Sequence, residues 1–309
     1  MSGTSIEVEV EGKSLKLSNL DKVLYPGTGF SKGQVVDYYT RIAPVLLPHL
    51  RQRALTLKRY PNGVDDKFFY EKNCPKHRPP WVNTVSVYSS RNKADVSYCV
   101  IDELASVVWV ANLASLELHT SLAASTKVEQ PTSLVFDLDP GAPATVVECS
   151  RVALWLREVL GQLGLECFPK SSGSKGLQIY APLNNEGVTY DDTKPFAHAI
   201  ARLLEGQHGD LVVSAMAKDV RKGKVFIDWS QNDFHKTTVC VYSLRARERP
   251  TVSTPLTWDE VEAVATTGDA SLATFETDAV LARVEKDGDL FAPVAEMQQS
   301  LPRPPDPPD

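Results

Sequence analysis

The sequence of 309 residues lacks any apolar run long enough to cross a membrane. Its longest apolar stretch, 105–114, is interrupted by Ser106 and Asn112. It is also shorter than the roughly 20 residues that a spanning helix requires. The first residues, MSGTSIEVEVEGK, have no basic segment followed by an apolar one, so they do not resemble a secretion signal. We therefore expect a cytoplasmic protein with no membrane partner.

Cysteine is scarce, and its spacing does not suggest pairing. The sequence has five cysteines and no C-x-x-C motif, and an odd count disfavours a disulfide framework, so we expect reduced thiols. Cys74 and His77 have the spacing of two metal ligands. A zinc site needs three or four ligands, however, and no second pair lies nearby in the sequence.

No strong excess of charge marks the chain as a whole, whose net charge is −6. Residues 250–309 contain three basic and twelve acidic residues, which leaves 30 basic and 27 acidic residues in the first 249. Within that part, basic residues cluster at 51–59 and 216–249. Such clusters are compatible with nucleic-acid binding, but for any one cluster an ordinary solvated surface is the favoured explanation.

The hydrophobic spacing predicts helices and strands that alternate without a regular βαβ rhythm. We expect a first helix that begins near Ser31 and includes Leu46, and further helices at 103–113, 144–163, 191–206, 257–266 and 277–287. We expect strands at 54–60, 68–71, 84–89, 97–101, 133–139, 165–169, 177–183, 211–215 and 224–230. This pattern predicts an α+β fold with mixed and antiparallel sheets flanked by helices. We expect one domain over 1–290 and a proline-rich tail or linker over 291–309.

Asp137 and Asp139 stand two apart at the end of an apolar run. In a strand this spacing places both carboxylates on one face, while Phe136 and Leu138 face the core. Two adjacent carboxylates repel each other, and a divalent cation with oxygen ligands is the usual compensation. A pair of turn-capping aspartates before Pro140 is the competing interpretation.

Asp228 ends a second apolar run, KVFIDWSQN, and is a candidate third ligand for one or two hard cations. It could instead cap the turn that follows. The segment SSGSKG at 171–176 offers backbone N–H groups, hydroxyls and a lysine, which together can bind a polyphosphate. It does not match the Walker A pattern, and a flexible hairpin is the alternative.

Other candidates have equally plain alternatives. His119 is either a strand histidine of the core or a donor to a triphosphate. Arg221 precedes Asp228 in a basic turn that could hold phosphates or could simply be solvated. Phe68 and Phe69 are either core residues or, because side chains alternate along a strand, a pair with one exposed ring that can stack on a base.

Six segments, taken in order, resemble the polymerase domain of bacterial DNA ligase D, within the archaeo-eukaryotic primase superfamily. They span most of the chain: KLSNLDKVLYP (16–26), LKRYPNGVDDKFFYEKNCP (57–75), LVFDLDPG (134–141), SSGSKGLQIYAPL (171–183), KVFIDWSQN (224–232) and KTTVCVYSLRAR (236–247).

The resemblance implies a primase-like catalytic core that adds nucleotides to a primer 3′-hydroxyl, with two divalent ions (Mn²⁺ or Mg²⁺) and NTPs or dNTPs. Matching positions imply catalytic metal ligands (Asp137, Asp139, Asp228), nucleotide contacts (Ser172, Lys175, His119, Arg221, Gln231, Arg245), a pocket for a DNA 5′-phosphate (Asn19, Lys22, Lys32) and contacts to template or DNA (Phe68, Phe69, Lys58, Arg59).

The resemblance also implies partners and a setting. Related domains fill short gaps and remodel broken ends in non-homologous end joining, with a preference for ribonucleotides. The expected partners are gapped or broken DNA with a 5′-phosphate, a Ku-type end binder and a separate DNA ligase, in the bacterial cytoplasm near the nucleoid. The sequence contains no ligase or nuclease module, so we expect a stand-alone relative or an excised domain.

Two other functions remain open. A metal-dependent nuclease or phosphodiesterase could use the same carboxylates, but it has no need for a triphosphate-binding loop. A non-catalytic DNA-end-binding module could keep the 5′-phosphate pocket, but it has no need for the three aspartates.

Overall fold

The computed structural model describes residues 5–89 and 93–302. Among these, the strands are β1 (Ser5–Val10), β2 (Lys13–Ser18), β3 (Val23–Tyr25), β4 (Phe30–Ser31), β5 (Arg53–Arg59), β6 (Phe69–Glu71), β7 (Asn83–Ser89), β8 (Ala94–Val100), β9 (Ser115–Ala124), β10 (Ser133–Pro140), β11 (Phe168–Ser171), β12 (Leu177–Pro182), β13 (Val212–Val213), β14 (Val225–Asp228) and β15 (Thr238–Val239). The α-helices are α1 (Lys32–Leu50), α2 (Leu104–Asn112), α3 (Val146–Gln162), α4 (Tyr190–Gln207), α5 (Trp258–Thr267), α6 (Thr277–Asp287) and α7 (Ala292–Glu296). The expected α+β class is confirmed.

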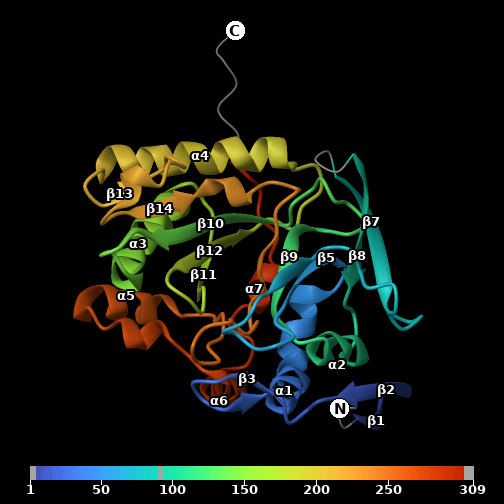
Figure 1. Ribbon diagram of the computed structural model, residues 1–309. Helices are drawn as coiled ribbons and strands as arrows, with labels where there is room; N and C mark the ends of the chain where they lie inside the picture. The colour runs from blue at the N-terminus through green and yellow to red at the C-terminus, as the bar shows by residue number, and fades with distance from the viewer. Residues whose placement is uncertain (1–4, 90–92, 303–309) are drawn as a thin grey trace.

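Two sheets lie side by side (Figure 1). One has the strand order β11-β12-β10-β14-β13, in which only the β13–β14 pair is parallel. The other has the order β15-β9-β5-β8-β7, and β6 pairs with β5 outside this path. Mixed and antiparallel pairing is therefore present, as the irregular order of the elements predicts.

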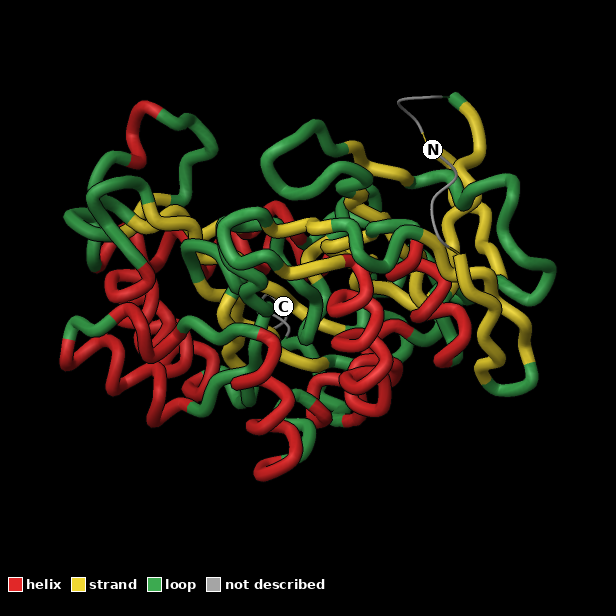
Figure 2. Tube along the Cα trace, turned by 60° about the horizontal axis from the view of Figure 1, so that its bottom comes forward, coloured by secondary structure: helices red, strands yellow, loops and turns green. Residues whose placement is uncertain are grey.

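Each sheet has its own core. Aliphatic side chains of α1 and α2 pack on the six-stranded sheet, and those of α3, α4 and α5 pack on the five-stranded sheet. Most of the helices gather on one side of the molecule, and strands and loops occupy the other (Figure 2). The strand faces that turn away from the helices are thus left for polar side chains.

Local sequence explains where α1 begins. Ser31 is its N-cap and accepts a hydrogen bond from the backbone N–H of Gln34, whose side chain accepts one from the N–H of Ser31. Pro44 and Pro48 both lie within the helix. The residues on its inner face, including Tyr39 and Ile42, are completely buried.

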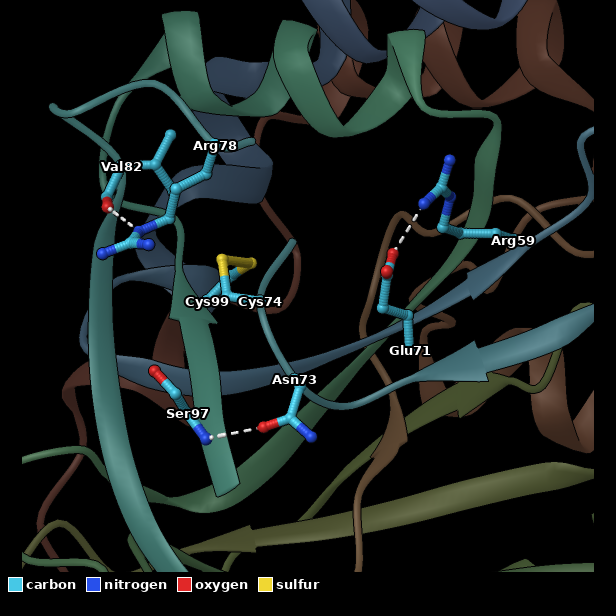
Figure 3. Close-up of a disulfide and its surroundings, with 8 residues drawn as sticks. All are labelled: Arg59, Glu71, Asn73, Cys74, Arg78, Val82, Ser97 and Cys99. Carbon is cyan, nitrogen blue, oxygen red and sulfur yellow. Dashed lines mark hydrogen bonds and ion pairs between the residues drawn. A yellow bond between two sulfur atoms is a disulfide. The ribbon is translucent and has the colours of Figure 1, made fainter. Parts of the chain in front are cut away.

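The expectation that all five cysteines are reduced thiols was wrong for two of them. Cys74 and Cys99 form a disulfide, whereas the other three cysteines are free and buried. The segment that follows β6 runs along β8, where Asn73 Oδ1 accepts from the N–H of Ser97 at 3.1 Å (Figure 3). A pairing across 25 residues depends on this tertiary contact, which the cysteine spacing does not reveal.

The packed chain extends past residue 290. Phe291 and Val294 are buried, and Asn184 Nδ2 donates to the carbonyls of Val294 and Met297 at 3.1 and 2.7 Å. The last part of the expected proline-rich tail, 303–309, lies outside the described residues. No helix in the described part of the chain is long and apolar enough to span a membrane.

Candidate active site

Asp137 and Asp139 lie on β10, the middle strand of the five-stranded sheet. Asp137 is opposite Gln178 of β12 on one side and opposite Asp228 of β14 on the other. Phe136 and Leu138 are fully buried in the core beneath α3 and α4. Both carboxylates line one pocket on the other face of the sheet, as the two-residue period of the strand predicts.

The carboxylates of this cluster are electrostatically unfavourable as they stand. Burial, followed by the charges of Asp139 and Asp228, raises the pKa of Asp137 to about 7. Burial and the neighbouring charge of Asp228 also raise the pKa of Asp139, against the opposing effect of Arg221 and Arg245. If all of these carboxylates were ionised, their negative charge would exceed the positive charge that neighbouring residues provide.

Asp228 is turned toward its own strand end. Its Oδ1 accepts from the N–H of Ser230 at 3.0 Å and from the hydroxyl of the same residue, and its Oδ2 accepts from Gln231 Nε2 at 2.9 Å. In the described chain, no three His, Cys, Asp or Glu side chains converge so as to hold one ion. Oxygen ligands with uncompensated charge nevertheless suit Mg²⁺ or Mn²⁺, and Asp228 would join them by leaving its turn contacts.

The SSGSKG loop connects β11 to β12 beside the carboxylates. The Oγ of Ser172 accepts from the N–H groups of Ser174 and Gly176, at 3.2 and 3.1 Å. At Gly176 an added Cβ would lie only 1.9 Å from the carbonyl oxygen of Leu138. This close approach requires glycine, and it holds the loop against β10 next to Asp139.

A pocket of about 530 Å³ joins these parts. Of the residues predicted to contact nucleotide or metal, it is lined by Asp137, Asp139, Ser172, Lys175, His119, Gln231 and Arg245. A second pocket, of about 480 Å³, adjoins it and shares Lys72, His235 and Thr237. Two candidates, Asp228 and Arg221, do not line either of these pockets.

Arg221 lies beside the site rather than in it. Its guanidinium packs over the ring of Phe226, 3.6 Å from the centroid, and its Nε donates to the carbonyl of Ala217 at 3.3 Å. A Cβ at Gly141 would collide with the carbonyl of Arg221 at 1.9 Å, so glycine there lets the basic turn approach the end of β10. The turn is thus close enough for Arg221 to affect Asp139 electrostatically.

Several polar residues of the pocket escaped the sequence analysis. Tyr70, Lys72 and Gln178 line it, and Glu117 lies just behind its wall. Lys170 is buried beneath the cluster and donates to Gln178 Oε1 at 2.5 Å. The alternation along β9 was a usable signal, because it places Glu117 and His119 on the same face of the strand.

The two phenylalanines are both on the surface. Phe68 is 49% and Phe69 43% exposed, so strand alternation does not bury either ring. Phe68 precedes β6 and stacks on Tyr60, with ring centroids 5.2 Å apart. Lys58 Nζ lies 4.5 Å from the centre of the Phe68 ring, and the guanidinium of Arg59 lies 5.2 Å from that of Phe69. These residues form a ridge of rings and cations.

Asn19, Lys22 and Lys32 form a separate basic site near the start of α1. Lys32 is only 6% exposed, and its Nζ donates to the carbonyl of Ser18 at 2.6 Å. Lys22 Nζ donates to Asn62 Oδ1 at 2.8 Å. Burial, with the charges of Lys22 and Arg59, lowers the pKa of Lys32 to about 8. A buried lysine whose charge is opposed by neighbouring cations favours a bound anion.

The chain is similar to known proteins of one family. Residues 31–291 match the family model "LigD, primase-polymerase domain". The chain is 40% identical over 294 residues to the multifunctional non-homologous end joining DNA repair protein LigD of Mycobacterium tuberculosis, covering 91% of this chain and 38% of that protein. It is 31% identical over 274 residues to the bifunctional LigD of Bacillus subtilis, covering 89% and 43%.

A solved structure has the same fold. The polymerase domain from Mycobacterium tuberculosis ligase D, in complex with DNA, is similar with a TM-score of 0.84 and 39% identity. The match covers 92% of this chain and 99% of that one. The chain therefore spans about two fifths of the length of the curated relatives, but nearly all of the solved domain.

Proposed function

This chain belongs to the family of LigD primase-polymerase domains, and on that premise we propose that it extends a DNA primer across short gaps at broken ends. A primase-polymerase domain is a nucleotidyltransferase. The proposed reaction forms a bond between the primer 3′-oxygen and the α-phosphorus of a nucleoside triphosphate, and releases pyrophosphate.

One observation carries the proposal: a single pocket combines Asp137 and Asp139 with the SSGSKG loop and with Lys175 and Arg245. In this pocket, carboxylates that favour bound cations lie beside backbone N–H donors and positively charged side chains. A nucleoside triphosphate with its divalent ions needs both in the same place. A phosphodiesterase would need the carboxylates alone, and an end-binding module would need neither.

The residues can be given roles in nucleotide transfer. Asp137 and Asp139, joined by Asp228 after it leaves Ser230, would hold two divalent ions. Such ions, Mn²⁺ or Mg²⁺, supply charge stabilisation at the attacking and leaving oxygens. A carboxylate of this cluster accepts the proton of the primer hydroxyl, in the manner of a general base.

Cationic residues would hold the triphosphate. Lys175 and Arg245 pair with phosphate oxygens, His119 donates to them, and the N–H groups of the loop around Ser172 add further donors. Gln231 leaves Asp228 and turns to the nucleotide. Arg221, beside the pocket, completes the positive rim by a side-chain movement.

The ridge of exposed rings suits DNA. Phe68 and Phe69 would stack against the template, while Lys58 and Arg59 contribute positive charge to the same surface. The basic site of Asn19, Lys22 and Lys32 would bind the 5′-phosphate of the strand downstream of the gap, because a phosphate would offset the positive charge of its two lysines.

The wider setting follows from the relatives. The LigD proteins of Mycobacterium tuberculosis and Bacillus subtilis are non-homologous end joining proteins, and the solved relative is bound to DNA. We place this domain at broken bacterial DNA near the nucleoid, with a Ku-type end binder and a DNA ligase as partners. We also propose that it prefers NTPs to dNTPs.

The test compares primer extension on two gapped duplexes that differ only in a 5′-phosphate or 5′-hydroxyl on the downstream strand. We expect faster extension with the phosphate, and we expect Lys32→Met to remove that difference while extension of a simple primer end stays unchanged. Equal extension of both substrates by the unaltered protein would contradict gap recognition through this site.

A further inference from the structure

Glu117 is a buried carboxylate just behind the wall of the site pocket. It is 2% exposed and lies on β9, where it is opposite Lys58 of β5. His119 follows two residues later on the same face of the strand. His119 and Arg245 line the pocket, whereas Glu117 does not.

The carboxylate of Glu117 contacts three cationic side chains. Its Oε2 lies 2.9 Å from Nε2 of His119, and its Oε1 lies 3.3 Å from Nζ of Lys58 and 3.5 Å from Nε of Arg245. Its Oε1 also accepts from the N–H of Ala246 at 3.1 Å. A single buried acid therefore joins side chains from β5, β9 and the segment after β15.

These contacts keep the acid ionised. Burial alone would raise the pKa of Glu117, but the hydrogen bond from His119 and the charges of Arg245, His119 and Lys58 lower it strongly. One negative charge thus faces Lys58, Arg245 and, when protonated, His119. The cluster has an excess of positive charge, and its residues His119 and Arg245 face the pocket.

Resting on the proposed nucleotide function, we propose that Glu117 is a positioning residue, which fixes His119 and Arg245 so that they face the triphosphate, and which anchors Lys58 beside them. It touches neither nucleotide nor reacting atoms and acts through its three neighbours. The ligand class that this arrangement serves is a polyphosphate anion.

The His119 contact shows how the positioning works. A carboxylate only accepts hydrogen bonds, so Nε2 of His119 must carry a proton toward Glu117. Nδ1 is then the ring atom left for a phosphate oxygen, and it can donate only if the ring is the imidazolium. Burial and the charges of Arg245 and Lys58 lower the pKa of His119 despite the opposing effect of Glu117. A bound phosphate anion would favour the imidazolium.

Arg245 connects Glu117 to the phosphate-binding loop. One terminal nitrogen of its guanidinium donates to the carbonyl oxygen of Ser172, in the phosphate-binding loop. Its Nε is buried without a hydrogen bond of good geometry. Glu117 therefore holds Arg245 mainly through charge, and Arg245 in turn is held to the loop that would bind the triphosphate.

The competing interpretation is a structural ion pair with no effect on ligand binding, and the chain offers a matched control. His49 Nε2 and Asp289 Oδ2 also lie 2.9 Å apart, and the two residues are 7% and 13% exposed in the ion pair. That pair lies outside the site pocket. Asp289→Asn should cost stability in the same way, without moving nucleotide affinity.

The experiment measures equilibrium binding of ATP and of adenosine, without DNA and without turnover, to the unaltered chain and to the variants E117Q, E117D and D289N. Circular dichroism and thermal unfolding of each variant check the fold. We expect E117Q to weaken ATP binding about tenfold or more, because charge-assisted hydrogen bonds to phosphate are lost. Adenosine binding should change by less than about twofold. E117D, which keeps the charge, should recover most of the ATP affinity.

The outcomes separate this inference from the proposed function. Loss of ATP affinity in E117Q, rescue in E117D and no loss in D289N would support the positioning role, even if the protein failed to extend primers. Unchanged ATP binding in E117Q would overturn it. If E117Q does not fold, E117D becomes the test. Equal losses of ATP affinity and adenosine affinity in a folded E117D, relative to the unaltered chain, would overturn the proposal as well. Failure of the unaltered chain to bind ATP more tightly than adenosine would also overturn it.

Discussion

The disulfide between Cys74 and Cys99 should contribute measurably to the free energy of unfolding. Hydrogen bonds beside it should keep the folded structure intact after reduction. The bond closes a loop across 25 residues, which includes β7 and most of β8. In the chain-entropy model, a loop of this length restricts the unfolded chain by about 3.5 kcal/mol at 25 °C. Reduction should therefore lower the free energy of unfolding by about 1 to 3.5 kcal/mol.

Two hydrogen bonds reduce the local consequence of opening the loop. The N–H of Cys74 donates to the carbonyl of Ser97 at 2.6 Å, and Asn73 Oδ1 accepts from the N–H of Ser97. The segment after β6 should therefore stay beside β8 when the sulfurs separate. We expect the folded structure to persist and the loss to appear in the unfolding equilibrium.

Urea unfolding of the oxidised and reduced protein measures the difference directly, through the shift in midpoint at similar slope. Cys74→Ser is the control, because it removes the bond and leaves the three free cysteines in place. Its midpoint should not respond to reductant. A difference of less than about 1 kcal/mol between the two states, or an equal response of the control, would refute the entropic reasoning.

Three further predictions concern the site. Burial and neighbouring cations lower the pKa of Lys32 from its usual 10.5 to about 8, so its charge is present below pH 8 and lost above it. The affinity for a 5′-phosphorylated strand, measured by fluorescence anisotropy, should therefore fall by about tenfold per pH unit above pH 8. The variant Lys32→Met should abolish this pH dependence. Asp139→Asn should abolish nucleotide addition while leaving the Kd for gapped DNA within about twofold, and retained addition would refute the metal-ligand role. Phe68→Ala should weaken DNA binding by about 1–3 kcal/mol without changing its salt dependence, so a changed salt slope in a titration would argue against stacking.

Much of the secondary structure follows from the sequence because the signals are local. The cap at Ser31 and the apolar spacing behind it specify α1, and the alternation around Asp137 specifies both a strand and the face of its carboxylates. Strand boundaries were less accurate where tertiary pairing sets the limit. The strand expected at 211–215 is reduced to Val212–Val213, because only these residues pair with β14.

Contacts between distant segments were beyond the reach of sequence patterns. The Cys74–Cys99 bond depends on where the segment after β6 crosses β8. Glu117 becomes notable only once β9 brings it to Lys58 and to the segment carrying Arg245. The strands β1 to β4 were not predicted, although the alternation in SIEVEV (5–10) was a usable signal, and they pair in two small sheets. The carboxylate of Asp228 caps its own turn, which is the alternative that the sequence left open for this residue.

The most direct test of the central claim is addition of a single nucleotide to a primer opposite each of the four template bases. NTPs and dNTPs are supplied separately, with Mn²⁺ or Mg²⁺, and the products are resolved on a gel. The account predicts growth of the primer by the complementary nucleotide, at a higher rate with NTPs, and release of pyrophosphate. A primer that stays unchanged despite tight DNA binding would contradict it in favour of an end-binding module, and a shortened primer would contradict it in favour of a nuclease.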